Sequence, residues 1–421
     1  MPAAAAALPA GMMKTNPIEN LAPMKLQAGT SAFRRANGAM FFGGLSTFAL
    51  LYGFQPLMLV FSDVFQLSPA QASGVVSAST GALAISLIPA SLAADRFGRK
   101  PLMNLALALA AILTVLSAFA QSFGQLLILR TLLGVAMSGL PAAAMAYLSE
   151  EIEPQSLGQS MGLYIAGSAL GGMSARFLSS ALAGMYSWQF AVGTLGAIGL
   201  VSAFFFWKFL PPSRHFKSTP LNVEMFVSDL KLHFSDRGLR WLFAVSFTLM
   251  GCFVSLYNYL AYRLSAAPFG LSHSQIGLVF TLYLLGMVGS TWSGKWADKI
   301  GRRNVLWIMP LLMVVGLLFT LANSLWIVMI GVGVFTFGFF GAHSVASSWV
   351  GRRVPRARAL ASALYLFFYY LGSSMLGTTS GLMWGLGHWT AVAGFLFLIL
   401  MVSTSIAIHL RKLQPLPTSQ I

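Results

Sequence analysis

Charged side chains are scarce in this sequence. They make up 9% of its 421 residues, whereas a soluble chain carries about 25%. Hydrophobic residues make up 57% of the chain, and its mean hydropathy is +0.75. Too few charges are present to cover a water-facing surface, which excludes an ordinary soluble domain. The composition predicts an all-α membrane protein that crosses the bilayer many times.

Cysteine is nearly absent as well, since Cys252 is the single one and lies inside an apolar run. A lone thiol excludes an internal disulfide framework and a cysteine metal site. The chain also lacks the phosphate-binding pattern G-x-x-x-x-G-K-[ST], which argues against ATP as the energy source. We therefore expect no cofactor and no metal.

What the chain does have is long apolar runs, and twelve of them are long enough to span a membrane. A bilayer core of about 30 Å takes about 20 residues of helix. The predicted spans are 38–60, 71–93, 101–120, 124–147, 157–183, 188–210, 241–263, 274–296, 304–322, 325–349, 359–384 and 388–410. They predict a flexible tail (1–36), a six-helix bundle (37–210), a central loop (211–240), a second bundle (241–410) and a C-terminal tail (411–421).

The basic residues predict the orientation. Of the 26 Lys and Arg, Arg130, Arg176 and Arg263 fall within predicted spans and away from the basic loops. The other 23 lie in the two tails, in alternate loops on one side or, as Lys208 and Lys295 do, in the last residues of the spans next to those loops. The positive-inside rule places that side, with both termini, in the cytoplasm. Because the bases are not gathered into a stripe with aromatics, we expect no binding of nucleic acid.

The two predicted bundles are repeats of one another. Asp95, Gly98 and Arg99 recur 203 residues later. A second set of residues recurs at an offset of 201, namely Leu163, Tyr164, Leu170 and Gly171 as Leu364, Tyr365, Leu371 and Gly372. Six spans in each half make the repeats parallel. Parallel repeats are typical of transporters that rock two halves around a site at the bilayer midplane.

The repeated loop carries a family resemblance. The stretch "GKWADKIGRR" (294–303) fits the pattern G-x-x-x-D-[RK]-x-G-[RK]-[RK] of the major facilitator superfamily, and "SLAADRFGRK" (91–100) fits it except at Ser91. The resemblance implies a gate on the cytoplasmic side. Its residues would be Asp95, Arg96, Gly98, Arg99 and Lys100 in the first copy, and Gly294, Asp298, Gly301, Arg302 and Arg303 in the second. Because Ser91 departs from the pattern, we expect the second copy to form the tighter gate.

Within that superfamily the chain most resembles the YnfM-type carriers of bacterial inner membranes, assigned to arabinose or drug efflux. The segments "LSEEI", "SMGLYIAG", "AHSVASSW" and "YYLGSS" carry this resemblance. It implies a monomeric, proton-coupled antiporter that exports a sugar, drug or organic anion. An uptake symporter or a facilitator of the same fold is the alternative. A membrane-embedded enzyme or sensor is remote, because neither clustered catalytic groups nor a soluble output domain is visible.

Two short motifs within spans bear on proton coupling. "RTLLG" (130–134) resembles the fourth-helix motif of the superfamily, in which the Arg is linked to proton coupling. "GSALGG" (167–172) resembles its fifth-helix antiporter motif, but Ser168 stands where that motif has Pro. The substitution weakens the implication of antiport.

Three ionisable residues inside the spans are candidates for proton coupling or substrate binding: Arg130, Arg176 and His343. Such groups are costly in a bilayer and usually face a cavity or a partner. A structural Arg bonded to carbonyls and a satisfied core His are the alternatives. No Asp or Glu lies in the middle of a span, which disfavours cationic substrates and favours neutral or anionic ones. His343 is the best candidate proton carrier.

Polar and aromatic residues on three helices could line a cavity, although helix packing would explain them equally well. They are Tyr52, Gln55, Asn258, Tyr259, Tyr262, Tyr365 and Tyr369. Two pseudo-symmetric cytoplasmic loops carry opposite charge. We hypothesise that in the outward-facing state Glu150, Glu151 or Glu153 bridges to Arg352, Arg353 or Arg356, with solvated faces as the alternative.

Overall fold

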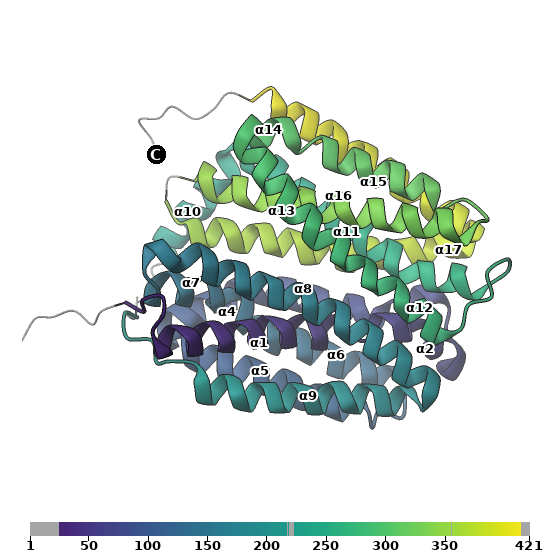
Figure 1. Cartoon of the computed structure of the whole chain (residues 1–421), viewed down its shortest axis with the longest axis horizontal. Coiled ribbons are helices and arrows are strands. Elements are labelled where there is room, and N and C mark those ends of the chain that lie inside the picture. The colour runs from purple at the N-terminus through teal and green to yellow at the C-terminus, as the bar shows by residue number, and fades with distance from the viewer. Residues whose placement is uncertain (1–24, 217, 219–222, 355, 414–421) are drawn as a thin grey trace, which may run out of the picture.

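The computed structural model describes residues 25–216, 218, 223–354 and 356–413. Apart from one isolated β-bridge, between Leu26 and Ile152, every regular element in those residues is helical. In Figure 1 the helices form two bundles, the first half of the chain below and the second half above. The all-α membrane fold predicted from composition is confirmed.

The first bundle runs from Ser31 to Phe209. Its helices are α1 (Ser31–Tyr52), η1 (Gln55–Leu57), α2 (Met58–Phe65), α3 (Pro69–Ala72), α4 (Gly74–Phe97), α5 (Arg99–Ser117), α6 (Phe123–Met137), α7 (Gly139–Glu151), α8 (Pro154–Met185) and α9 (Trp188–Phe209). α1 begins before the predicted end of the tail at residue 36. The predicted flexibility of residues 1–24 concerns a segment outside the described residues.

The second bundle follows α10 (Val223–Ser235), a helix within the segment predicted as a loop. Its helices are α11 (Arg237–Ser265), α12 (His273–Val279), η2 (Phe280–Leu282), α13 (Tyr283–Ile300), α14 (Arg302–Val305), α15 (Ile308–Phe319), α16 (Leu325–Arg353) and α17 (Arg358–Arg411). Each predicted span overlaps one of these helices or one of the first bundle.

Ten helical stretches in the described residues are long and apolar enough to cross a membrane. One of them is α17, whose 54 residues would measure about 80 Å as a straight helix, far more than a bilayer core. Non-helical torsion angles at Gly387 and His388 break it there. The Gly- and Ser-rich α8 is not among the ten. The total of twelve spans therefore stays a prediction.

Helix ends repeat between the bundles as the sequence does. Ser68 and Gln71 form a capping box at the start of α3, and Ser272 and Gln275 form the same box at the start of α12. Such a box satisfies free backbone N–H groups at a helix start. Gly98 and Gly301 end α4 and α13 with φ of +102° and +91°, a region that favours glycine.

Glycines also let helices within each bundle approach closely. A Cβ at Gly171 of α8 would overlap the carbonyl oxygen of Leu45 in α1. At the equivalent place in the second bundle, a Cβ at Gly372 of α17 would overlap the carbonyl oxygen of Phe247 in α11. Small residues at such contacts are what allow helices to associate in lipid.

The linker between the bundles is divided between them. Near its start, Tyr147 of the first bundle donates a hydrogen bond to the carbonyl of Pro211 (3.0 Å). Near its end, Asp236 pairs with Arg353 of α16 at 2.7 Å. The linker before residue 219 is thus attached to the first bundle, and the linker after residue 222 is attached to the second. Residues 219–222, which connect the two parts along the chain, lie outside the described residues.

We expect Gly171→Ala to lower the thermal stability of the purified protein by the equivalent of about 1–3 kcal/mol, because the added methyl group overpacks the α1–α8 contact. Gly162→Ala on the same helix is the matched control, since a Cβ there meets no atom within 4 Å. Equal melting temperatures for the two variants would contradict this account of the contact.

Candidate functional site

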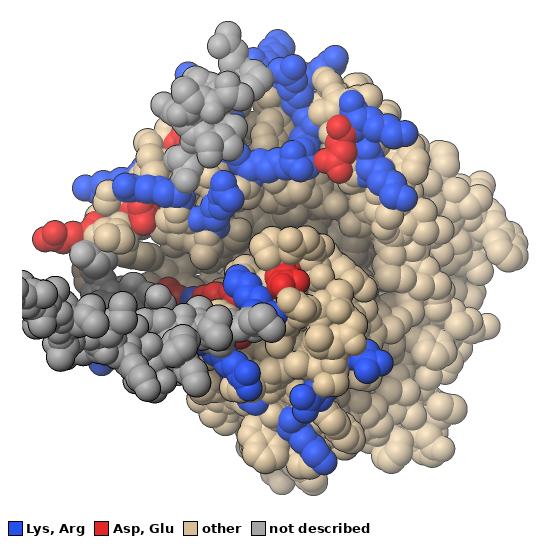
Figure 2. Space-filling model, turned by 60° about the vertical axis from the view of Figure 1, so that its left-hand side comes forward, with Lys and Arg blue, Asp and Glu red and all other residues tan. Residues whose placement is uncertain are grey.

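The charged loops lie together at one end of the molecule, which we call the charged end. They are the segments 95–100, 150–153, 298–303, 352–354 and 356–358. Figure 2 shows Lys and Arg gathered there around a hollow between the two bundles. The opposite end, formed by residues 55–77, 180–187, 258–275 and 374–389, is called the far end.

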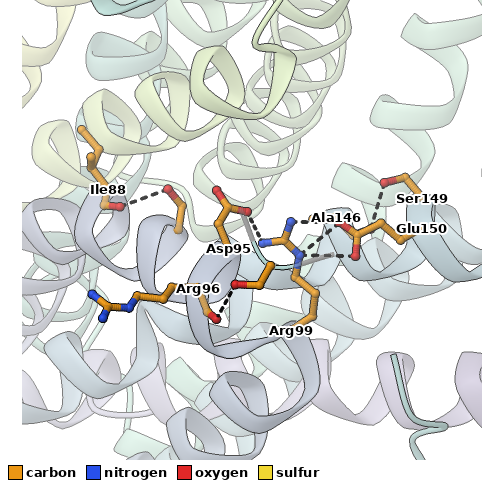
Figure 3. Close-up of polar contacts among 9 residues, drawn as sticks. Ile88, Asp95, Arg96, Arg99, Ala146, Ser149 and Glu150 are labelled. Atoms are coloured by element: carbon orange, nitrogen blue, oxygen red, sulfur yellow. Dashed lines mark hydrogen bonds and ion pairs between the residues drawn. The ribbon is translucent and has the colours of Figure 1, made fainter. Parts of the chain in front are cut away.

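At the charged end the first motif copy holds two acids on one arginine (Figure 3). Arg99 pairs with Asp95 one turn earlier, and its Nη2 lies 2.9 Å from Oε1 of Glu150. Arg99 thereby ties the end of α4 to the end of α7. Lys100 donates to the carbonyl of Leu210, and the carbonyl of Arg96 accepts from Ser218 (3.2 Å), so linker residues pack on this motif.

The second copy is more loosely held. Arg302 pairs with Asp298 at 2.9 Å and donates to Ser348 Oγ at 3.0 Å, while Arg352 lies 3.9 Å from Asp298. Gly294 and Gly301 lie at the middle and end of this motif's helix, and Arg303 is exposed. One guanidinium here holds one carboxylate instead of two. Because the charged end is parted in this conformation, our expectation that the second copy forms the tighter gate stays a prediction.

The predicted bridge between the acidic and basic loops is not formed in this conformation. On the acidic side, Glu150 pairs with Arg99, Glu151 with His215, and Glu153 with Gln27. On the basic side, Arg352, Arg353 and Arg356 pair with Asp298, Asp236 and Asp229. Each residue has a partner in its own bundle, the linker or the N-terminal segment. The hypothesis concerned the other conformation and stays a prediction.

The bundles are joined at the far end. Ser62 shares a 2.7 Å hydrogen bond with Tyr262, and Ser180 donates to the carbonyl of His273 at 2.6 Å. On the other side of the boundary, Thr378 donates to Ser77 at 2.8 Å. At the charged end, no hydrogen bond or ion pair joins 31–209 to 237–411 within the described part of the chain. The molecule is thus closed at the far end and parted at the charged end.

Arg130 is fully buried and acts inside the first bundle. Its Nε donates to the carbonyl of Val75 (2.9 Å) and its Nη1 to that of Leu50 (2.9 Å). Its Nη2 bonds the carbonyl of Leu51 and Ser79 Oγ, and Phe54 lies 4.1 Å from the guanidinium carbon. Leu50 and Leu51 precede the break between α1 and η1, where carbonyls lose their helical donors. These contacts fit the structural alternative for Arg130.

Arg176 lies at the boundary between the bundles. Its Nε donates to Oε1 of Gln55 at 2.6 Å, and its Nη1 donates to the carbonyl of Gly172 at 2.7 Å. Gln55 in turn donates from Nε2 to Oδ1 of Asn258 in the second bundle, at 2.7 Å. A polar chain therefore runs from α8 through η1 to α11 and joins three residues that the sequence had suggested separately: Arg176, Gln55 and Asn258.

His343 lies in an aromatic cluster of the second bundle. Its Nδ1 is 3.0 Å from the hydroxyl of Tyr365, and the ring centroids of His343 and Tyr369 are 4.8 Å apart. Its Nε2 makes no hydrogen bond to any described residue. Two of the residues predicted to line a cavity are bonded to the backbone. The hydroxyl of Tyr259 donates to the carbonyl of Gly377 (2.7 Å), and that of Tyr262 donates to the carbonyl of Met58 (3.0 Å). These bonds fit the alternative that both residues serve helix packing.

Sequence reasoning missed Phe280 and Tyr283, which stand over the Arg176 guanidinium at 5.8 and 4.9 Å. Neither has a counterpart in the first half; Thr80 occupies the position 203 residues before Tyr283. The one available signal was a tyrosine in the middle of an apolar run, which is too common to single it out.

We expect Arg130→Lys to lower the melting temperature of the protein markedly more than Arg263→Lys does. An ammonium cannot reach all the carbonyls that the guanidinium fork binds, and each orphaned buried carbonyl costs about 1–3 kcal/mol. Arg263 serves as the matched control because it donates to one carbonyl, that of Ala322, at 2.8 Å. Equal losses in the two variants would refute the structural role.

Comparisons with known proteins agree with this architecture. A sequence model of the Major Facilitator Superfamily matches residues 40–265 and 264–420. The chain is 44% identical to the inner membrane transport protein YnfM of Escherichia coli, over 92% of this chain and 93% of that protein. It is 42% identical to the uncharacterised MFS-type transporter YybF of Bacillus subtilis, over 93% and 97%.

Solved structures share the fold at low identity. A bacterial homologue of the lysosomal transporter Spinster, in an inward-facing and unoccupied conformation, superposes with a TM-score of 0.75 at 17% identity, covering 91% of this chain and 98% of the other. A D-xylose–proton symporter superposes with a TM-score of 0.72 at 18% identity, covering the same shares. From the sequence match across both bundles and the identity to these bacterial relatives, the chain belongs to the Major Facilitator Superfamily of membrane transporters.

Proposed function

We propose that this protein is a secondary carrier of small organic solutes in a bacterial inner membrane, and that it works by alternating access. The observation that carries the proposal is the one-sided junction of the bundles, with hydrogen bonds at the far end and none at the charged end in the described residues. By the positive-inside rule the charged end is cytoplasmic, so this arrangement is inward-facing.

In this carrier, transport requires the far-end contacts to break and the charged end to close. The three far-end hydrogen bonds named above join neutral groups, and each contributes about 0.5–1.5 kcal/mol net. Such contacts can be exchanged for others during a transport cycle. Within each bundle, glycine-mediated backbone contacts between helices suit rigid-body motion. One such contact also crosses the far end, where a Cβ at Gly381 of α17 would lie 2.4 Å from Cα of Ala70 in α3.

A disulfide across the far end should lock the carrier. In a Cys252→Ser background, we expect oxidation of the pair Ser77→Cys and Thr378→Cys to abolish solute uptake by proteoliposomes, and reductant to restore it. The two native hydroxyls lie 2.8 Å apart on different bundles. Uptake is measured over a panel of sugars, organic anions and drugs, with and without an imposed pH gradient.

The matched control is the pair Thr248→Cys and Ser403→Cys, whose native hydroxyls lie 3.0 Å apart within the second bundle. Its oxidation should leave uptake intact. Uptake that survives the far-end lock would refute alternating access by these bundles. A panel in which the unlocked protein moves no solute would refute the carrier function itself.

We propose further that transport is coupled to protons as efflux by antiport, with His343 as the proton carrier. Histidine changes charge near neutral pH, and Nε2 of His343 is free of protein partners in the described residues. Tyr365 and Tyr369 of α17 face its ring, and no charged side chain of the described residues pairs with it. Uptake by symport is the alternative outcome of the pH-gradient experiment.

We expect His343→Gln to remove the dependence of transport on an imposed pH gradient while leaving solute exchange at equal pH on both sides. Glutamine keeps a polar partner for Tyr365 but cannot carry a proton. The measurement compares gradient-driven uptake with counterflow in the same proteoliposomes. Gradient-driven uptake equal to that of the unmodified protein would eliminate His343 as the carrier.

A further inference from the structure

Arg176 is a buried cation with no anionic partner. Its side chain is 2% exposed, and no carboxylate in the described residues forms an ion pair with it. Taking a charge out of water costs several kcal/mol unless a counter-ion and hydrogen bonds compensate. Arg130 meets this cost with carbonyls on all three of its nitrogens, but Nη2 of Arg176 donates to no atom of the described residues.

Aromatic rings from both bundles surround this guanidinium. Tyr52 of the first bundle lies 4.6 Å from its central carbon, and Tyr283 of the second bundle lies 4.9 Å from it. Cation–π contacts of this kind compensate the charge partly, through the faces of the rings. They leave the edge of the guanidinium, with its N–H groups, available to an acceptor.

The polar groups around Arg176 are short of acceptors. The hydroxyls of Tyr52 and Tyr283 are buried without a hydrogen-bond partner, and so is Nδ2 of Asn258. Ser373 Oγ neighbours the Tyr52 hydroxyl, but neither is in hydrogen-bond geometry. Buried donors in folded proteins are nearly always satisfied, so a cluster of orphaned donors calls for a ligand. An anionic oxygen ligand would satisfy them and the charge together.

We propose that Arg176 binds the carboxylate of an aromatic monocarboxylate, with Tyr52 and Tyr283 as flanking hydroxyl donors. The inference rests on the proposed carrier function and names the substrate class for it. A carboxylate matches the guanidinium edge with two parallel hydrogen bonds. The rings that enclose Arg176 give an apolar, planar body its contact surface.

The same geometry couples binding to the far-end junction. Gln55 now supplies the acceptor for Nε of Arg176, and its own amide holds Asn258 (2.7 Å) and the carbonyl of Val254 (3.3 Å) of the second bundle. A carboxylate is the stronger acceptor for Arg, so it competes with Gln55 for Nε. Displaced from Arg176, Gln55 loses the contact that orients it toward α11. Substrate binding therefore weakens the contacts that close the far end. A ligand can shift a carrier between two conformations only if it interacts differently with each of them, and this weakening supplies such a difference.

The binding experiment uses benzoate and its neutral isostere benzamide on the purified full-length protein. We expect benzoate to raise the melting temperature in a saturable manner and benzamide to have at least about tenfold weaker effect, because a charged hydrogen-bonded pair is lost. Arg176→Gln should reduce the response to benzoate to that of benzamide. Arg176→Lys should retain part of it. Arg263→Gln, which removes an Arg outside this cluster, should leave it unchanged.

A built-in carboxylate supplies a second test that does not depend on removing the arginine. Gln55→Glu places an acid within reach of Nε of Arg176, so the response to benzoate should disappear while the protein stays folded. The control is Gln125→Glu, an exposed residue at the start of α6. A response to benzoate that survives Gln55→Glu or Arg176→Gln would overturn the site, as would equal responses to benzoate and benzamide or no response to either.

The coupling has its own readout. With Cys252 replaced by Ser, a cysteine at Ser62 reports on the far-end junction, where the native hydroxyl contacts Tyr262. We expect benzoate, but not benzamide, to increase its labelling rate by a maleimide several-fold. Labelling that benzoate leaves unchanged would overturn the coupling. The far-end disulfide experiment tests the carrier function without reference to Arg176, so failure of the substrate site and failure of the carrier are distinguishable.

Discussion

A guanidinium keeps its charge inside a membrane protein, and the two buried arginines of the first bundle show two ways of meeting that constraint. Arg130 uses carbonyls that the break between α1 and η1 leaves without helical donors. The break and the arginine therefore depend on each other within one rigid unit. Arg176 is served by an amide and by rings from both bundles. Its environment exists only while the far end is closed, so it must change when the bundles part.

At the charged end the two halves differ in charge at equivalent positions, and each of these charges is paired by a residue of opposite sign. Arg353 stands 203 residues after Glu150, so the repeat places a base where the first bundle has an acid. Glu150 completes the pairing of Arg99, and Asp236 of the linker supplies the carboxylate for Arg353 at 2.7 Å. The linker is thus part of the second bundle's ion pairing. The start of the linker is bonded to the first bundle and its end to the second.

The sequence predicted the all-α fold, the approximate positions of the long apolar helices, the repeat and the charged end, but it missed α10, which lies in the segment predicted as a loop. These properties depend on the length of the apolar runs, on glycines in the repeated loops and on the distribution of Lys and Arg among the loops. All of these features are local in the sequence. The partners of Arg176 could not be predicted, because Gln55 precedes it by 121 residues and its aromatic neighbours come from the other bundle. Gln55 and Asn258 were singled out as cavity residues, yet their hydrogen bond depends on which conformation the bundles adopt. The pairing of the acidic loop within its own bundle was missed for the same reason.

The energetics of the two ends suit a carrier whose states are close in free energy. At the far end the bundles exchange neutral hydrogen bonds, and a handful of these contribute only a few kcal/mol. At the charged end the residues of the acidic and basic loops already have partners in their own bundle, the linker or the N-terminal segment, so closing that end would replace existing contacts by new ones. Because ion pairs are both lost and gained in that exchange, their contributions largely offset one another. A ligand shifts an equilibrium only by its differential affinity for the two states. The exchange of an acceptor at Arg176 is one such difference, because Gln55 also holds Asn258 of the second bundle while the far end is closed.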